Sequence, residues 1–111
     1  MRIAFLVRYF LAGVLLTNSM PHFAISLTGR RNMTPFGPNS SAEVNLLWGV
    51  LNLLCGLFLI RSTDRKTHVD PCAHQWLMAL LSGGLFWSVF MVVMEASGFT
   101  HQQDVVTKAV A

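Results

Sequence analysis

Two apolar segments of the chain carry the same regular pattern of small and polar residues. In each segment four such residues follow one another at spacings of four, three and four positions. They are Asn45, Gly49, Asn52 and Gly56 in the segment 44–60, and Gly84, Ser88, Met91 and Glu95 along the segment that begins at 77. These spacings keep each set on one face of a helix with 3.6 residues per turn. In lipid, such a face is expected to pack against another helix.

A third apolar stretch opens the chain, between Ile3 and Thr28. All three stretches are about as long as a helix needs to cross a bilayer. We therefore predict an all-α integral membrane bundle of three transmembrane helices, at about 3–28, 41–60 and 75–97, which forms a single membrane domain over 1–111. The first stretch allows two registers, Ile3–Phe23 or Tyr9–Thr28, and Pro21 is expected to kink or end its helix.

Two polar loops separate the predicted helices. In the first loop, 29–40, Pro35 and Pro38 exclude regular helix. Ser40 to Glu43 fits a capping box that starts the second helix, with Ser40 as the N-cap residue. The second loop, 61–74, is predicted to begin at Arg61.

The composition supports a membrane protein. Hydrophobic residues make up 53% of the chain and charged residues only 12%, whereas a soluble domain has about 25% charged residues. The net charge of +3 comes from residues beside the apolar segments, which fits lipid head groups better than nucleic acid. The first twenty residues resemble a signal peptide, but residues 17–21 match a cleavage site poorly, so we predict an uncleaved helix.

The positions of lysine and arginine predict the orientation. Five of them fall beside the N-terminus and the second loop, and three fall in the first loop and the C-terminal tail. The excess favours a cytoplasmic N-terminus, with the first loop outside. In that orientation the polar and ionisable residues of the three helices converge on the outer half of the bundle: Asn18, His22, Asn45, Asn52, Ser88 and Glu95.

These residues have two interpretations. They could form a polar pocket open to the outer side, with His22 and Glu95 as its ionisable members. They could instead form hydrogen bonds between helices, each worth about 0.6 kcal/mol. Glu95 could also pair with Arg30 or Arg31 at the membrane surface.

The sequence predicts no catalytic residue, no metal site and no cofactor. His68, Cys72 and His74 lie close together in the second loop, but they are one ligand short of a structural zinc site. The methionines share no spacing, which is typical of packing residues. No phosphate-binding loop, catalytic triad or metalloprotease motif occurs.

A set of short motifs in the first half of the chain resembles a family of small bacterial multi-pass inner-membrane proteins of uncharacterised activity. The motifs are Asn18-x-x-Pro21-His22-Phe23, Thr34-Pro35-Phe36 and Asn45-x-x-Trp48-Gly49-x-x-Asn52. The resemblance implies a bacterial inner membrane. It also implies that the first loop and the ends of the first two helices form one unit, which adds Trp48 to the candidate residues.

Three functions fit these observations. The first is a non-enzymatic accessory, regulatory or oligomeric membrane component, whose polar faces pack within a homo-oligomer or against a larger membrane partner. The alternative is a subunit of a small-solute or cation transporter with an outward-facing polar pocket. A third possibility is a quinone-linked role for His22 and the aromatic cluster Phe86, Trp87 and Phe90.

Overall fold

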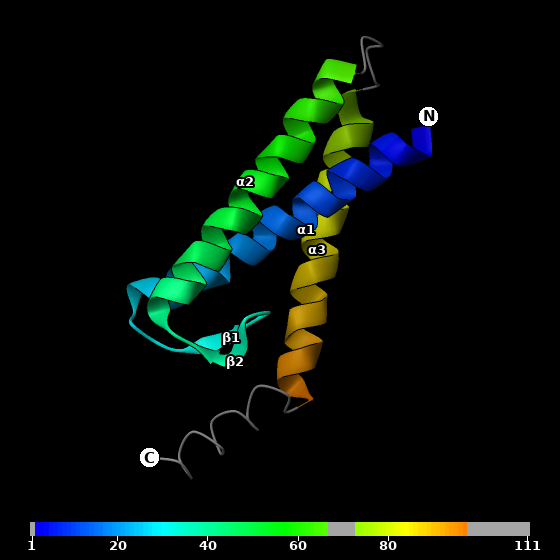
Figure 1. Ribbon diagram of the computed structural model, residues 1–111. Coiled ribbons are helices and arrows are strands. Elements are labelled where there is room, and N and C mark those ends of the chain that lie inside the picture. The colour runs from blue at the N-terminus through cyan, green and yellow to red at the C-terminus, as the bar shows by residue number, and fades with distance from the viewer. Residues whose placement is uncertain (1, 67–72, 98–111) are drawn as a thin grey trace.

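The computed structural model describes residues 2–66 and 73–97 and consists of three long helices and one small hairpin (Figure 1). The helices are α1 (Arg2–Leu27), α2 (Ala42–Lys66) and α3 (Ala73–Ala96). Strands β1 (Asn32–Thr34) and β2 (Gly37–Ser40) pair antiparallel between α1 and α2. All three helices are long and apolar enough to cross a membrane. The prediction of an all-α bundle with three membrane-spanning helices is confirmed.

Helix α1 forms the centre of the bundle. It packs against both α2 and α3, whereas the described parts of α2 and α3 make few contacts with each other. The two outer helices lie close together at the end near the N-terminus and diverge toward the hairpin (Figure 1). The hairpin and the C-terminal half of α3 therefore lie apart, on either side of α1 (Figure 1).

Glycines bring α1 and α3 into direct backbone contact. A Cβ atom added at Gly13 would collide with the carbonyl oxygen of Leu80, and one added at Gly83 would collide with that of Phe10. A Cβ atom at Gly84 would lie 2.8 Å from Oγ1 of Thr17. Gly13 and Gly83 meet backbone atoms that cannot move aside, so a residue without a side chain is needed at both positions for the two helices to approach this closely.

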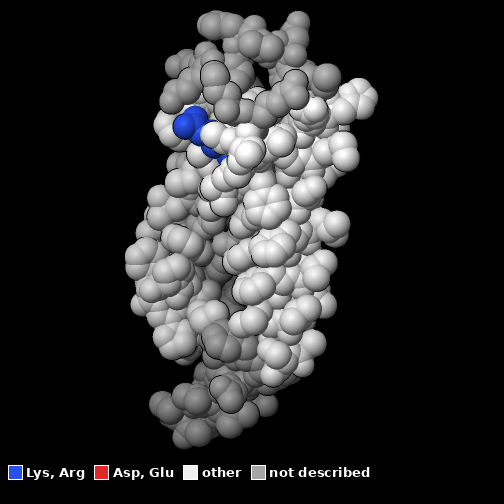
Figure 2. All heavy atoms as spheres, turned by 90° about the vertical axis from the view of Figure 1, so that its right-hand side faces the viewer, with Lys and Arg blue, Asp and Glu red and all other residues white. Residues whose placement is uncertain are grey.

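The interior of the bundle is small and polar, and its outside is apolar. The only large apolar side chain that is buried among the described residues is Tyr9, whereas Asn45 and Ser19 are almost completely enclosed. Leucine, valine and phenylalanine side chains cover the outside, and only 6% of the α3 span is buried. On the face seen in Figure 2, one small basic patch lies near one end, and no acidic side chain is visible among the described residues. This inversion of the usual pattern fits a bundle surrounded by lipid.

The first helix matches the predicted span of about 3–28. α1 runs from Arg2 to Leu27 with Pro21 inside it, so of the two effects expected of Pro21, a kink or an end, the helix does not end there. It stops at Gly29, whose φ of 68° allows the Gly29 and Arg30 amides to bond back to Ser26 and Ile25, as in a Schellman motif. A helix can tolerate proline in a membrane where neighbouring groups satisfy the freed carbonyl.

The second helix is longer than predicted and starts one residue later. The N-cap residue is Ser41, whose Oγ accepts the Val44 amide at 3.3 Å, so the prediction of Ser40 in this role is wrong. The helix also continues through Arg61 to Lys66, because this stretch contains no glycine or proline that would stop it. The predicted second loop therefore begins at least six residues too early. The third helix, predicted at about 75–97, is observed as Ala73–Ala96. Gly98, a residue type that commonly follows the end of a helix, lies outside the described residues.

Candidate functional site

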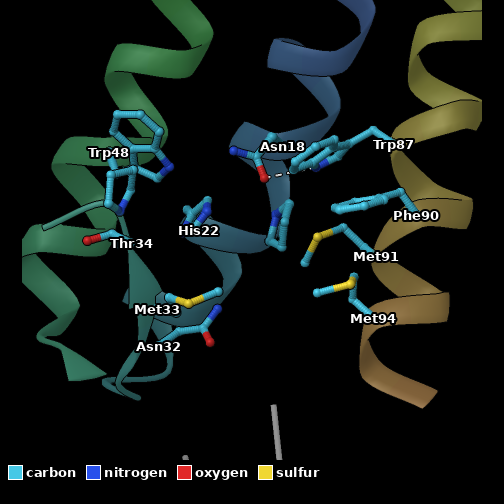
Figure 3. Close-up of a pocket in the computed structure, with 12 residues that line it drawn as sticks. Asn18, His22, Asn32, Met33, Thr34, Trp48, Trp87, Phe90, Met91 and Met94 are labelled. Atoms are coloured by element: carbon cyan, nitrogen blue, oxygen red, sulfur yellow. Dashed lines mark hydrogen bonds between the residues drawn. The ribbon is translucent and has the colours of Figure 1, made fainter. Parts of the chain in front are cut away.

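A directional chain of hydrogen bonds links the three helices. The indole Nε1 of Trp87 on α3 donates to Oδ1 of Asn18 on α1 at 2.9 Å (Figure 3). Nδ2 of Asn18 then donates to Oδ1 of Asn52 on α2 at 3.2 Å. Nδ2 of Asn52 donates in turn to the carbonyl oxygen of Trp48, one turn earlier in α2, at 2.8 Å. Each amide oxygen accepts and each amide nitrogen donates, so the orientation of both asparagines is fixed.

A second cluster ties the hairpin to α1 and α2. Asn45 is completely buried, and its Nδ2 lies 3.0 to 3.3 Å from the carbonyl oxygens of Asn32, Ser40 and Ser41. Its Oδ1 lies 2.8 Å from Nδ1 of His22. Because the amide nitrogen faces three acceptors, Oδ1 must accept from His22, and the proton of the neutral imidazole therefore sits on Nδ1.

The hairpin is also held together internally. The hydroxyls of Thr34 and Ser40 lie 2.7 Å apart, and Ser40 donates to the carbonyl of Gly37 at 3.0 Å. The ring of Phe36, at the turn, contacts Trp48 edge-on at a centroid distance of 5.9 Å. Thr34 and Ser40 are buried although they belong to the segment that connects α1 and α2, so the hairpin is packed against the helices and is not a freely exposed loop.

An apolar cavity of about 350 Å³ lies beside these two clusters, between the hairpin and the C-terminal half of α3. α1 forms its floor, the hairpin and Trp48 form one wall, and the C-terminal half of α3 forms the other (Figure 3). The described residues that line it include no Asp, Glu, Lys or Arg. They are Asn18, Pro21 and His22 of α1; Asn32, Met33, Thr34 and Pro35 of the hairpin; Trp48 of α2; and Trp87, Phe90, Met91 and Met94 of α3.

The structure brings together five of the seven candidate residues. Asn18, His22, Asn45, Trp48 and Asn52 all belong to the two clusters, and all except Trp48 are buried. Ser88 and Glu95 do not join them. Ser88 is exposed and bonds to the carbonyl of Gly84 in its own helix, and Glu95 is exposed on the same helix.

The face of α3 that meets the site overlaps the predicted face only at Met91. The α3 residues that line the cavity are Trp87, Phe90, Met91 and Met94, whereas Ser88 and Glu95 do not line it. The sequence indicates Trp87 only as part of an aromatic cluster with Phe86 and Phe90. The hairpin residues Asn32 and Met33 carry no pattern that marks them as part of a site, because they reach it only through the pairing of the two strands. Of the loop histidine and cysteine set, His68 and Cys72 lie outside the described residues.

Comparison with models of protein families, with curated proteins and with solved structures finds no match for this chain. The resemblance to a bacterial inner-membrane family therefore stays a prediction based on its motifs.

Proposed function

We propose that the chain is a non-enzymatic accessory subunit of a larger membrane assembly, located in a bacterial inner membrane with its N-terminus in the cytoplasm. In this role it presents the hairpin to a partner protein at the outer surface. The observation that carries the proposal is the fixed shape of the hairpin, which a completely buried Asn45 holds through two of its backbone carbonyls.

A loop that only joined two helices would not need hydrogen bonds from a buried side chain to hold its backbone in one conformation. Phe36 lies at the turn of this fixed hairpin, and 66% of the surface of Phe36 is exposed. Exposed aromatic residues held in a fixed position are typical anchors of protein interfaces. Arg31 adds a fixed charge nearby, since its guanidinium donates to the carbonyl of Asn39 at 3.2 Å.

The transporter alternative receives less support. A solute path across a membrane needs polar groups that are free to contact the solute. Here the polar side chains of Asn18, Asn45 and Asn52 are engaged with one another or with backbone carbonyls. Gly13, Gly83 and Gly84 lie in the contact between α1 and α3 of the same chain. The partner protein therefore contacts the hairpin and not these glycines.

Site-specific photocrosslinking tests this proposal. A photoreactive phenylalanine analogue is placed at Phe36, or at Phe58 as the matched control, because Phe58 is 69% exposed on the membrane span of α2. We expect position 36 to yield one defined adduct in native membranes, and position 58 to yield none. Coexpression of two differently tagged copies shows whether the adduct contains a second copy of the chain. No adduct from position 36, or the same products from both positions, would refute the proposal.

A further inference from the structure

The imidazole of His22 leaves one hydrogen-bond acceptor facing the apolar cavity. Its Nδ1 is the donor to Asn45, so Nε2 of the neutral ring carries the lone pair. Nε2 has no hydrogen-bond partner among the described residues, although the side chain is only 7% exposed. No fully enclosed side-chain nitrogen or oxygen in the described part of the chain lacks a partner. Nε2 is therefore in contact with open space, and the space that His22 lines is the cavity.

The rest of the cavity selects a neutral and apolar ligand. Its described lining carries no charged side chain, so an ion would lose its hydration without gaining a counter-charge. The indole N–H of Trp87 is already bound to Asn18, which leaves the flat faces of Trp87 and Phe90 for contact. These two rings stack at a centroid distance of 5.2 Å. Met91 and Met94 beside them have flexible side chains that adapt to a ligand.

Size and position limit the ligand further. A volume of about 350 Å³ is near the lower end of the range for small-molecule sites, which is about 300 to 1,000 Å³. It accommodates a substituted single ring but not a long lipid tail. The cavity lies between the hairpin with Trp48 and the C-terminal half of α3 (Figure 3), so a tail attached to the ring has to extend beyond the cavity into the surrounding lipid.

We propose that this cavity binds the head group of a quinol-type lipid, a neutral ring that carries a hydroxyl group and an apolar tail. The hydroxyl donates a hydrogen bond to Nε2 of His22, and the ring packs between the thioethers and the aromatic faces of α3. The proposal does not depend on the accessory role, because it concerns the cavity and not the exposed turn of the hairpin.

A binding titration with the full chain in lipid nanodiscs tests the proposal. Decylubiquinol is added, and the fluorescence of the tryptophans is followed, since Trp48 and Trp87 both line the cavity. We expect quenching that saturates. The dimethyl ether of the same compound lacks the hydroxyl donor, and we expect it to bind about fivefold more weakly, the effect of one lost hydrogen bond. Quenching that does not saturate, or equal affinity for the ether, would overturn the proposal.

Two variants of α3 locate the binding. Met94→Phe fills the cavity from its wall, and we expect saturable quenching to disappear. Val92→Phe is the matched control, because Val92 is on the same helix, is 65% exposed and does not line the cavity. We expect this variant to bind like the wild type. Binding that survives Met94→Phe, or that is lost equally in both variants, would place the ligand elsewhere and refute the site.

Discussion

The indole of Trp87 donates its hydrogen bond to the side-chain oxygen of Asn18, sixty-nine positions earlier in the chain, at 2.9 Å. This bond joins α3 to the central helix α1. It also fixes which atom of Asn18 faces α2, because the amide nitrogen is then left to donate to Asn52. A single asparagine thus connects the two outer helices through the central one.

Removal of this asparagine is expected to weaken the bundle. Asn18→Leu deletes the bonds to Trp87 and Asn52 and leaves their polar atoms without partners. We expect the free energy of unfolding in mixed micelles to fall by about 1 to 2 kcal/mol. Ser88→Ala serves as the control, because Ser88 is exposed and bonds only within its own helix. A variant Asn18→Leu as stable as the wild type would show that the chain of hydrogen bonds does not hold the helices.

Loss of Asn45 is expected to release the hairpin without separating α1 from α3. Asn45→Ala removes the bonds to the carbonyls of Asn32 and Ser40, whereas the α1–α3 contacts lie elsewhere. Backbone hydrogen exchange should become faster across residues 32–40 and stay unchanged in α3. Asn39→Ala is a suitable control, because Asn39 is exposed and accepts from Arg31 only through its backbone carbonyl. Equal exchange rates in the two variants would show that the hydrogen bonds of Asn45 do not hold the hairpin.

The close approach of α1 and α3 is expected to tolerate no side chain at Gly83. Gly83→Leu would place its Cβ onto the carbonyl of Phe10, so the two helices have to separate. Fluorescence-detected size exclusion in detergent should show aggregation or loss of the folded protein. Ser82→Leu, at the adjacent exposed position, should elute like the wild type. If both leucine variants behave alike, the backbone contact is not needed for folding.

Much of the fold could be predicted from the sequence, because hydrophobic length determines a membrane helix almost alone. The face of α2 was also predictable. Asn45, Gly49, Asn52 and Gly56 recur at helical spacing, and all four are buried. Here the polar and small residues are surrounded by apolar ones, so their periodicity stands out.

The face of α3 could not be predicted in the same way. Nearly all its residues are apolar, and the residues that meet the site, such as Trp87 and Met91, differ little in polarity from those that face lipid. Ser88 and Glu95 therefore suggested a face that the structure leaves exposed. Hydrophobicity carries little information about which side of such a helix packs inward.

The hairpin could not be predicted from the sequence for a different reason. Its strands contain three and four residues, and Gly37-Pro38-Asn39-Ser40 has low strand propensity. Tertiary bonds from Asn45 hold this segment, and local sequence preference does not reveal such long-range contacts. The donor role of His22 depends on the same contacts, so the acceptor that it leaves in the cavity could not be foreseen either.

The central claim is that Trp87, Asn18 and Asn52 are joined by hydrogen bonds between the helices and do not bind water along a path through the bundle. Hydrogen exchange of side-chain N–H groups, measured by NMR in lipid bicelles, tests it without any substitution. We predict that the indole N–H of Trp87 and the amide of Asn52 exchange far more slowly than the amide of Asn39, which is exposed on the hairpin. Exchange at Trp87 and Asn52 as fast as at Asn39 would mean that water reaches these groups, and the account would be contradicted.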